Sequence, residues 1–133
     1  LEWWDNLQQR YNGTRISFSE TIMLDSECKI DSEVWDSVVD NLLQNALAKA
    51  RQAPEILIHA HVVMNEQVFV EVTDSGNPMP DDVATSLFRK RIRSEGGLGI
   101  GLYQAGRQAQ QAGYQLSLIN NQPRQVCFRL AMK

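Results

Sequence analysis

The sequence predicts a single α+β domain, a two-layer sandwich in which helices cover one face of a mixed, mainly antiparallel sheet. The chain has 133 residues, of which 43% are hydrophobic and 22% charged, enough for one domain with its own core. Strand-like and helix-like segments alternate irregularly, and most neighbouring strand segments are joined by stretches short enough for hairpins. With no internal repeat and no low-complexity linker, residues 1–133 are expected to form one unit.

The first half of the chain is expected to form a short helix, a strand and a long helix. Residues 1–12 have apolar side chains at helical spacing and end at an Asn-Gly pair. Residues 15–24 alternate and are rich in β-branched residues, as is typical of a strand. Residues 31–52 carry a broad apolar stripe behind a capping Asp31 or Ser32, which predicts a long amphipathic helix.

The second half is expected to contain two hairpins and two further helices. The first hairpin precedes a loop with two prolines and a short helix capped by Asp81. A glycine-rich stretch then leads into a helix that ends at Gly113, before the closing hairpin. The expected strands are 55–64, 68–73, 114–120 and 125–131, and the expected helices are 81–88 and 100–112.

Composition excludes several classes of protein. The formal charge of −3 and the pI near 5.3 argue against a general nucleic-acid or membrane-surface binder. Cys28 and Cys127 lack metal-ligand spacing and are expected to be buried free thiols, which favours a cytoplasmic location. No apolar run reaches the roughly 20 residues of a membrane helix. Because the chain opens with Leu1, we expect a fragment of a longer protein, with residues 1–12 the remnant of a connection to an upstream domain.

Three features could carry chemistry. Asn41 and Asn45 lie four residues apart on the long helix, at the edge of its apolar stripe, and amide oxygens suit Mg²⁺. Asp74 ends a strand in phase with its buried valines, so its carboxylate should face the helices and could accept a hydrogen bond from an exocyclic amine. Residues 96–101 hold four of the eight glycines directly before a helix, where backbone N–H groups can bind an anion. Structural amides, a turn aspartate and packing glycines are the alternatives.

These three features occur in an order and spacing that resemble the ATP-binding domain shared by gyrase, Hsp90, histidine kinases and MutL. These proteins form the GHKL superfamily, whose fold is called the Bergerat fold. The resemblance is greatest to the catalytic domain of bacterial sensor histidine kinases and covers about residues 15–131. Residues 40–46 resemble the family's N box, 74–76 its first glycine box, 87–88 its F box and 97–102 its second glycine box.

The resemblance implies that ATP binds between the helical layer and a lid of roughly residues 81–96. Asn45 would coordinate Mg²⁺, Asn41 would contact phosphate or its water shell, and Asp74 would bind the adenine amino group. The other implied nucleotide contacts are Gly76, Met79, Phe88, the backbone of Gly97, Leu98, Gly99, Ile100, Gly101 and Leu102, and a cation from Lys49 or Arg93.

The resemblance also implies a reaction. In hydrolysing relatives a glutamate four residues before the metal-binding asparagine is the general base, but here that residue is Asn41, which cannot accept a proton. We therefore expect a histidine kinase that donates the ATP γ-phosphoryl group to a histidine on a separate dimerisation domain of the same protein, and acts indirectly on a response regulator. No nucleic acid and no metal other than Mg²⁺ is expected as a partner.

The sequence departs from the family pattern at several positions. Pro78 replaces the second glycine of the first glycine box, and Leu98 replaces a hydroxyl residue of the second. Ala48 stands where a lysine is expected, and Lys49 falls one place later, about 100° further round the helix. Ser94-Glu95 stands where short lids often carry Thr-Lys, so Arg91 or Arg93 could supply the missing charge.

These departures leave two alternatives open: a degenerate nucleotide-sensing or interaction module, and a free-standing serine kinase of the anti-sigma-factor type. His59 and His61 share one face of a predicted strand and are expected on the sheet surface, with a fortuitous metal contact as the alternative. Trp3 and Trp4 could pack on this domain's own core or on an absent helical hairpin.

Overall fold

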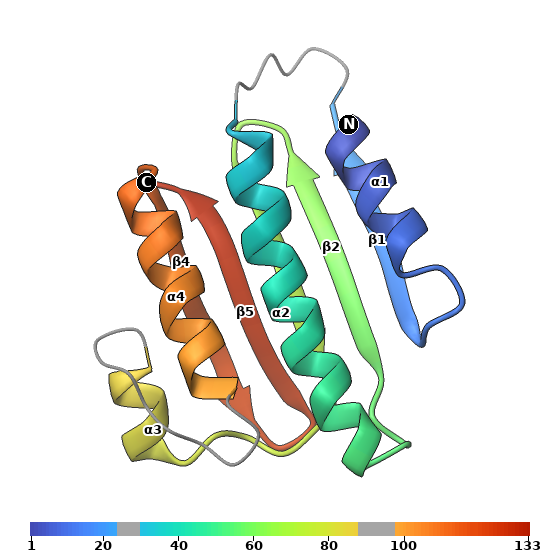
Figure 1. The fold of residues 1–133 in the computed structure, drawn as a ribbon, viewed down its shortest axis with the longest axis vertical. Helices are drawn as coiled ribbons and strands as arrows, with labels where there is room; N and C mark the ends of the chain where they lie inside the picture. Colours follow the sequence, from blue (N-terminus) through green and yellow to red (C-terminus); the bar gives the residue numbers. More distant parts are fainter. Residues whose placement is uncertain (24–29, 88–97) are drawn as a thin grey trace.

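A computed structural model describes residues 1–23, 30–87 and 98–133, and it confirms the predicted fold. One five-stranded sheet forms the first layer, and helices α1, α2 and α4 cover one of its faces as the second (Figure 1). The elements are α1 (Glu2–Arg10), β1 (Ile16–Ile22), α2 (Ser32–Gln52), β2 (Ile58–Met64), β3 (Val68–Asp74), α3 (Asp81–Ser86), α4 (Leu98–Gln111), β4 (Tyr114–Gln122) and β5 (Gln125–Met132).

The strands lie in the order β1-β2-β3-β5-β4. Strands β1 and β2 are parallel, because α2 carries the chain back across the sheet between them. The pairs β2–β3, β3–β5 and β4–β5 are antiparallel, so the sheet is mixed and mainly antiparallel as expected. Strand β3 lies in the middle, and α2 therefore packs over the centre of the sheet between α1 and α4 (Figure 1).

Local signals account for most element boundaries. Of the two possible caps of α2, the structure selects Asp31, whose carboxylate accepts a hydrogen bond from Val34 N at 3.3 Å. Gly13 and Gly113 follow α1 and α4 with φ of +84° and +89°, the left-handed conformation that glycine adopts most easily. Strand β2 begins three residues later than predicted, because Ile56 N bonds to Ala53 O and closes a turn first.

One predicted cap is wrong. Asp81 does not cap α3 but is its first residue, and Pro80 occupies the cap position without a side-chain hydrogen bond to the helix. The helix instead begins from the carbonyl of Pro80, which accepts from Ala84 N at 2.9 Å. Because proline fixes φ close to the value seen here, −55°, it can precede a helix without a capping side chain.

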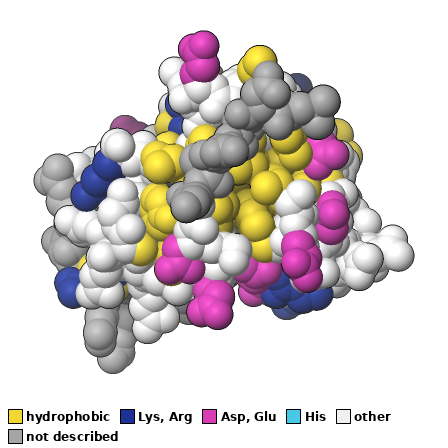
Figure 2. Space-filling view, turned by 90° about the horizontal axis from the view of Figure 1, so that it is seen from above, with side chains coloured by type: hydrophobic (Ala, Val, Ile, Leu, Met, Phe, Trp, Pro, Cys, Tyr) yellow, Lys and Arg dark blue, Asp and Glu magenta, His cyan; other side chains and the backbone are white. Residues whose placement is uncertain are grey.

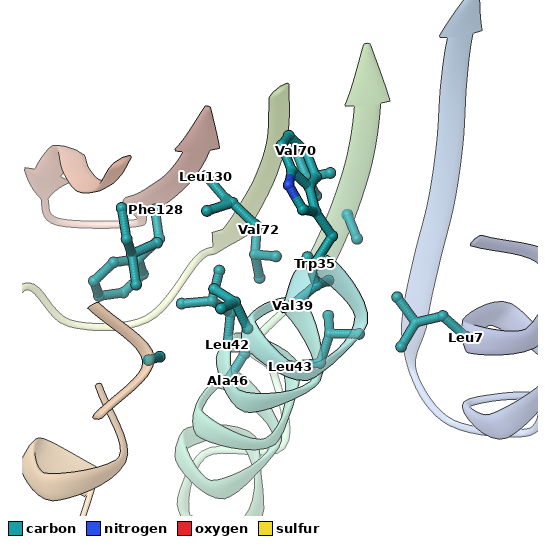
Figure 3. Close-up of a cluster of buried hydrophobic side chains, with 14 of the residues drawn as sticks. Leu7, Trp35, Val39, Leu42, Leu43, Ala46, Val70, Val72, Phe128 and Leu130 are labelled. Carbon is teal, nitrogen blue, oxygen red and sulfur yellow. The ribbon is translucent and has the colours of Figure 1, made fainter. Parts of the chain in front are cut away.

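The core lies between α2 and the sheet (Figure 3). Figure 3 shows Trp35, Val39 and Leu42 of α2 directed at Val72 and Leu130 of the central strands. Trp3 and Trp4 belong to this domain's own core, since they are 8% and 0% exposed. The Trp4 ring meets Phe18 of β1 edge-on, with 5.6 Å between ring centroids, so α1 is joined to the sheet by aromatic packing.

Figure 2 views the end of the molecule where β1, β2 and β5 finish, and hydrophobic side chains gather in its middle. Ile22, Met23 and Met132, from the ends of β1 and β5, are among the most exposed large apolar residues described. Within the described ranges no helix is both long and apolar enough to cross a membrane. Cys127 is a buried free thiol whose pKa is raised by desolvation, so it stays protonated at neutral pH, whereas Cys28 lies outside the described residues.

Candidate functional site

The carboxylate of Asp74 lies on the helical side of the sheet, as predicted. Asp74 is the last residue of β3, pairs with Ile58 and Val126 on either side, and is 4% exposed. Its Oδ1 accepts hydrogen bonds from Lys49 Nζ at 2.8 Å and from Gly76 N at 2.9 Å. A buried carboxylate needs such donors, and these two hold the carboxylate in place at the end of β3.

Gly76 lies so close to this carboxylate that a larger residue would not fit. A Cβ at position 76 would be 2.9 Å from Asp74 Oδ1, 3.0 Å from Ile56 Cδ1 and 3.1 Å from Lys49 Cε. The glycine of the predicted first glycine box is therefore required by the close approach of these three side chains.

The turn between β4 and β5 supports the loop that follows Gly76. Asn121 Oδ1 accepts from Met79 N at 2.8 Å, and Asn121 Nδ2 donates to Met79 O at 2.9 Å. Arg124 N also donates to Gly76 O at 3.1 Å. These bonds hold the Met79 backbone, while Asn121 gave no signal in the sequence because its partner lies 42 residues away.

The paired asparagines lie on α2 facing the start of α4. Asn45 is 5% exposed, and its Oδ1 is buried without a hydrogen-bond partner in the part of the chain that the structure describes. An unpaired buried oxygen of this kind costs about 1–3 kcal/mol, so it is a place where a ligand would be favourable. Asn41 lies against Gly101, where an added Cβ would be 3.1 Å from Asn41 Oδ1.

A hollow of about 420 Å³ has Asn41, Asn45 and Gly101 of α4 in its lining. It is lined by Ser37, Asp40, Asn41, Gln44, Asn45, Ala48, Arg51 and Gly101. Most of its wall is one stripe of α2, because residues three and four apart share a helix face. Arg51 is a cation on this stripe that we did not single out from the sequence, although its helical spacing from Asn41 and Ala48 could have revealed it.

The side chain of Lys49 lies beside Asp74 and is not among the residues that line the hollow with Asn41 and Asn45. Its Nζ bonds to Asp74 and also to the carbonyl of Asn77 at 3.2 Å. The one-residue displacement from Ala48 explains this, because it turns the side chain about 100° round α2. Ala48 itself lines the hollow without a charge.

The remaining predicted site residues lie in the second glycine box and in the segment before it. Helix α4 begins at Leu98, two residues earlier than predicted, so the last residues of the second glycine box lie inside the helix and not before it. Leu102 is buried at 1% exposure. Gly99 and Ile100 belong to this first turn. Phe88, Arg93 and Gly97, together with Arg91 and the Ser94-Glu95 pair, lie outside the described residues.

His59 and His61 lie on the sheet face away from the helices, as expected. Their rings stack with 6.3 Å between centroids. Ser19 Oγ lies 2.7 Å from His59 Nε2 and also contacts His61 Nδ1, while Ser17 and Thr21 contact the outer ring nitrogens. Neighbouring hydroxyls thus satisfy both imidazoles. No group of three metal-ligating side chains is found among the residues described.

Comparisons with known proteins agree with this geometry. Residues 30–133 match the family model described as histidine kinase-, DNA gyrase B-, and HSP90-like ATPase. The catalytic domain of histidine kinase ThkA, in a nucleotide-free form, is similar in structure, with 22% identity, a TM-score of 0.73, and coverage of 98% of this chain and 88% of that one. The mycobacterial sensor histidine kinase MprB has 18% identity and a TM-score of 0.64, covering 98% and 89%. No curated protein matches the sequence.

The family match covers most of the chain. The chain therefore belongs to the histidine kinase-, DNA gyrase B- and HSP90-like ATPases, an ATP-binding domain family. The structural neighbours establish that its fold is that of histidine kinase catalytic domains.

Proposed function

We propose that this chain is the ATP-binding catalytic domain of a two-component sensor histidine kinase. It donates the γ-phosphoryl group of Mg-ATP to a histidine on a dimerisation domain of the same protein, from which a response regulator takes the phosphoryl group. The observation that carries the proposal is Asn41, which stands where hydrolysing relatives have a glutamate base and whose Oδ1 would lie 3.1 Å from a Cβ added at Gly101 of α4. An amide there cannot activate water, so transfer to a protein side chain is favoured.

The residues of the site fit a nucleotide from its base to its phosphates. Asp74 accepts the adenine amino group while Lys49 and Gly76 hold its carboxylate. The backbone at the start of α4 and the Arg51 guanidinium face the phosphates across the hollow. The catalytic contribution of this chain is then positioning and charge neutralisation, since its residues hold the donor while water is excluded.

Mg²⁺ fits the same site. The Asn45 Oδ1 is a hard, neutral and buried oxygen with no partner among the described residues. Mg²⁺ keeps waters and phosphate oxygens as its other ligands, so one protein ligand is enough. When bound, it would neutralise charge on the β- and γ-phosphates.

The test is calorimetric titration with an unreactive ATP analogue and Mg²⁺. We expect binding in the micromolar to submillimolar range, and Asp74→Asn should weaken it by about tenfold or more, because the neutral amide accepts the adenine amine less strongly. Asn45→Ala should reduce the Mg²⁺ dependence of binding. Asn65→Ala, in the hairpin at the other end of β3, is the matched control and should bind normally. Failure to bind at millimolar nucleotide would rule the proposal out.

A second candidate is a degenerate nucleotide-sensing module. It is favoured by Ala48, which leaves the hollow without the expected lysine, and by Lys49, which is engaged with Asp74. The full-length protein separates the two, because a kinase incorporates the γ-phosphate as an acid-labile phosphohistidine. If the protein binds ATP but never labels, the sensing module is correct.

A further inference from the structure

Helix α1 binds the acidic edge of α2. Asp36 and Asp40 lie one turn apart on α2 and face the last turn of α1. Arg10 forms an ion pair with Asp36, and its second guanidinium nitrogen lies 3.7 Å from Asp40 Oδ1. The Tyr11 hydroxyl donates to the same Asp40 oxygen at 2.5 Å. Both carboxylates are thus held from the α1 side.

Tyr11 also connects this edge to the hollow. Its hydroxyl accepts a hydrogen bond from Gln44 Nε2 at 2.9 Å, so it bridges Asp40 and Gln44. Asp40 and Gln44 are also among the residues that line the hollow beside Asn41 and Asn45. Tyr11 itself is 5% exposed, and burial, followed by the bond to Asp40, raises the pKa of its phenol, so the hydroxyl keeps the proton it donates.

The charge of Asp40 is poorly placed for a nucleotide. Asp40 directly precedes Asn41, and its side chain is 35% exposed, so its charge is only partly screened by water. Phosphate groups in the hollow would be repelled by a carboxylate free to turn toward them. Helix α1 lies on the opposite side of α2 from α4 and Gly101 (Figure 1). The bonds from α1 therefore direct the carboxylate away from the phosphate side.

We propose that Tyr11 is a positioning residue for nucleotide binding, which holds the Asp40 carboxylate toward α1 and so keeps its negative charge away from the phosphates. The inference rests on the proposed ATP function. It makes α1 part of the nucleotide site, since the last turn of this helix determines where the charge beside Asn41 lies.

A double-mutant cycle tests the proposal, with the dissociation constant of the Mg²⁺-bound ATP analogue as the readout. Tyr11→Phe keeps the buried ring and removes the hydroxyl. We expect about fivefold weaker binding, because repulsion between the Asp40 carboxylate and the phosphates would be partly screened by water. Asp40→Asn keeps an acceptor for Tyr11 and removes the charge, so it should bind at least as tightly as the wild type. The double variant should match Asp40→Asn, because Tyr11 acts only through that charge.

Two further measurements separate charge positioning from a loss of packing. Tyr114→Phe is the matched control, because the Tyr114 hydroxyl also bonds to the α2 region, accepting from Asp31 N at 2.8 Å, but lies away from the hollow. It should bind normally at temperatures where all variants are folded. The penalty of Tyr11→Phe should also shrink as salt rises from about 0.05 to 0.5 M, which a packing defect would not do.

The possible failures are distinguishable. If the wild type does not bind the analogue, the proposed function fails. If the wild type binds but Tyr11→Phe binds equally well or more tightly, or is weakened by the same factor in the Asp40→Asn background, only the role of Tyr11 is overturned.

Discussion

At two positions of this domain, the neighbouring side chains determine whether a residue larger than glycine can fit. Gly76 and Gly101 both face a side chain of the site, but the surroundings differ. The three atoms nearest to a Cβ at Gly76 would belong to three different side chains, one of them the buried Asp74 carboxylate, whereas the three nearest to a Cβ at Gly101 would all belong to the amide of Asn41. Variants of the two glycines therefore test the proposed base side and the proposed phosphate side separately.

We expect Gly76→Ala to lower the free energy of unfolding by about 1–3 kcal/mol, because Asp74, Ile56 and Lys49 cannot all move apart. Gly101→Ala should leave stability nearly unchanged or raise it slightly, since alanine favours the helix and the Asn41 side chain can yield. It should nevertheless weaken binding of the ATP analogue. Urea denaturation and calorimetry of both variants measure this contrast, and equal losses of stability would contradict it.

At the scale of elements, the sequence predicts what lies along one helix or strand better than what two elements bring together. The phase of β3 predicted that Asp74 faces the helices, and the spacing of Asn41 and Asn45 predicted a shared helix face. The bonds from Asn121 to Met79 and from Tyr11 to Asp40 could not be predicted, because no local pattern records a partner 42 or 29 residues away. The predicted cap of α3 was wrong because Asp81 is a favourable capping residue, but the proline before it occupies the cap position.

Helix α2 supplies one more testable residue. Arg51 lies on the stripe of α2 that lines the hollow. It is three residues beyond Ala48, the position at which the family pattern has a lysine. We expect Arg51→Ala to weaken ATP binding by about three- to tenfold, as for loss of one partly exposed cation near phosphate, with little effect on stability. Arg107→Ala, on the exposed side of α4, is the charge-matched control. Equal affinity of both variants would show that Arg51 does not contact the nucleotide.

At the scale of the whole molecule, α2 is the element that the site and the core share. One of its faces packs on the central strands (Figure 3), another lines the hollow, and its edge toward α1 bonds to Arg10 and Tyr11. Strand β3, which runs antiparallel to β2, ends and helix α4 begins at the end of the sandwich opposite the one in Figure 2. Movement of α1 on its own would therefore disturb both the core and the edge of α2 that borders the hollow.

This arrangement predicts that α1 unfolds together with the rest of the domain, although it begins the chain and could have been a loose extension. Trp4 is fully buried against Phe18, and Leu7 is buried beside it in the same core. Trp4→Ala should cost about 3–5 kcal/mol, the usual range for a buried aromatic residue, whereas Glu2→Ala on the exposed side of α1 should cost little. Urea unfolding followed by tryptophan fluorescence and by far-ultraviolet circular dichroism should give one coincident transition, because a shared core unfolds as a unit. If fluorescence changes at lower urea than dichroism, and Trp4→Ala shifts only the fluorescence transition, α1 is a separate appendage and its hydrogen bonds to Asp40 cannot control the nucleotide site.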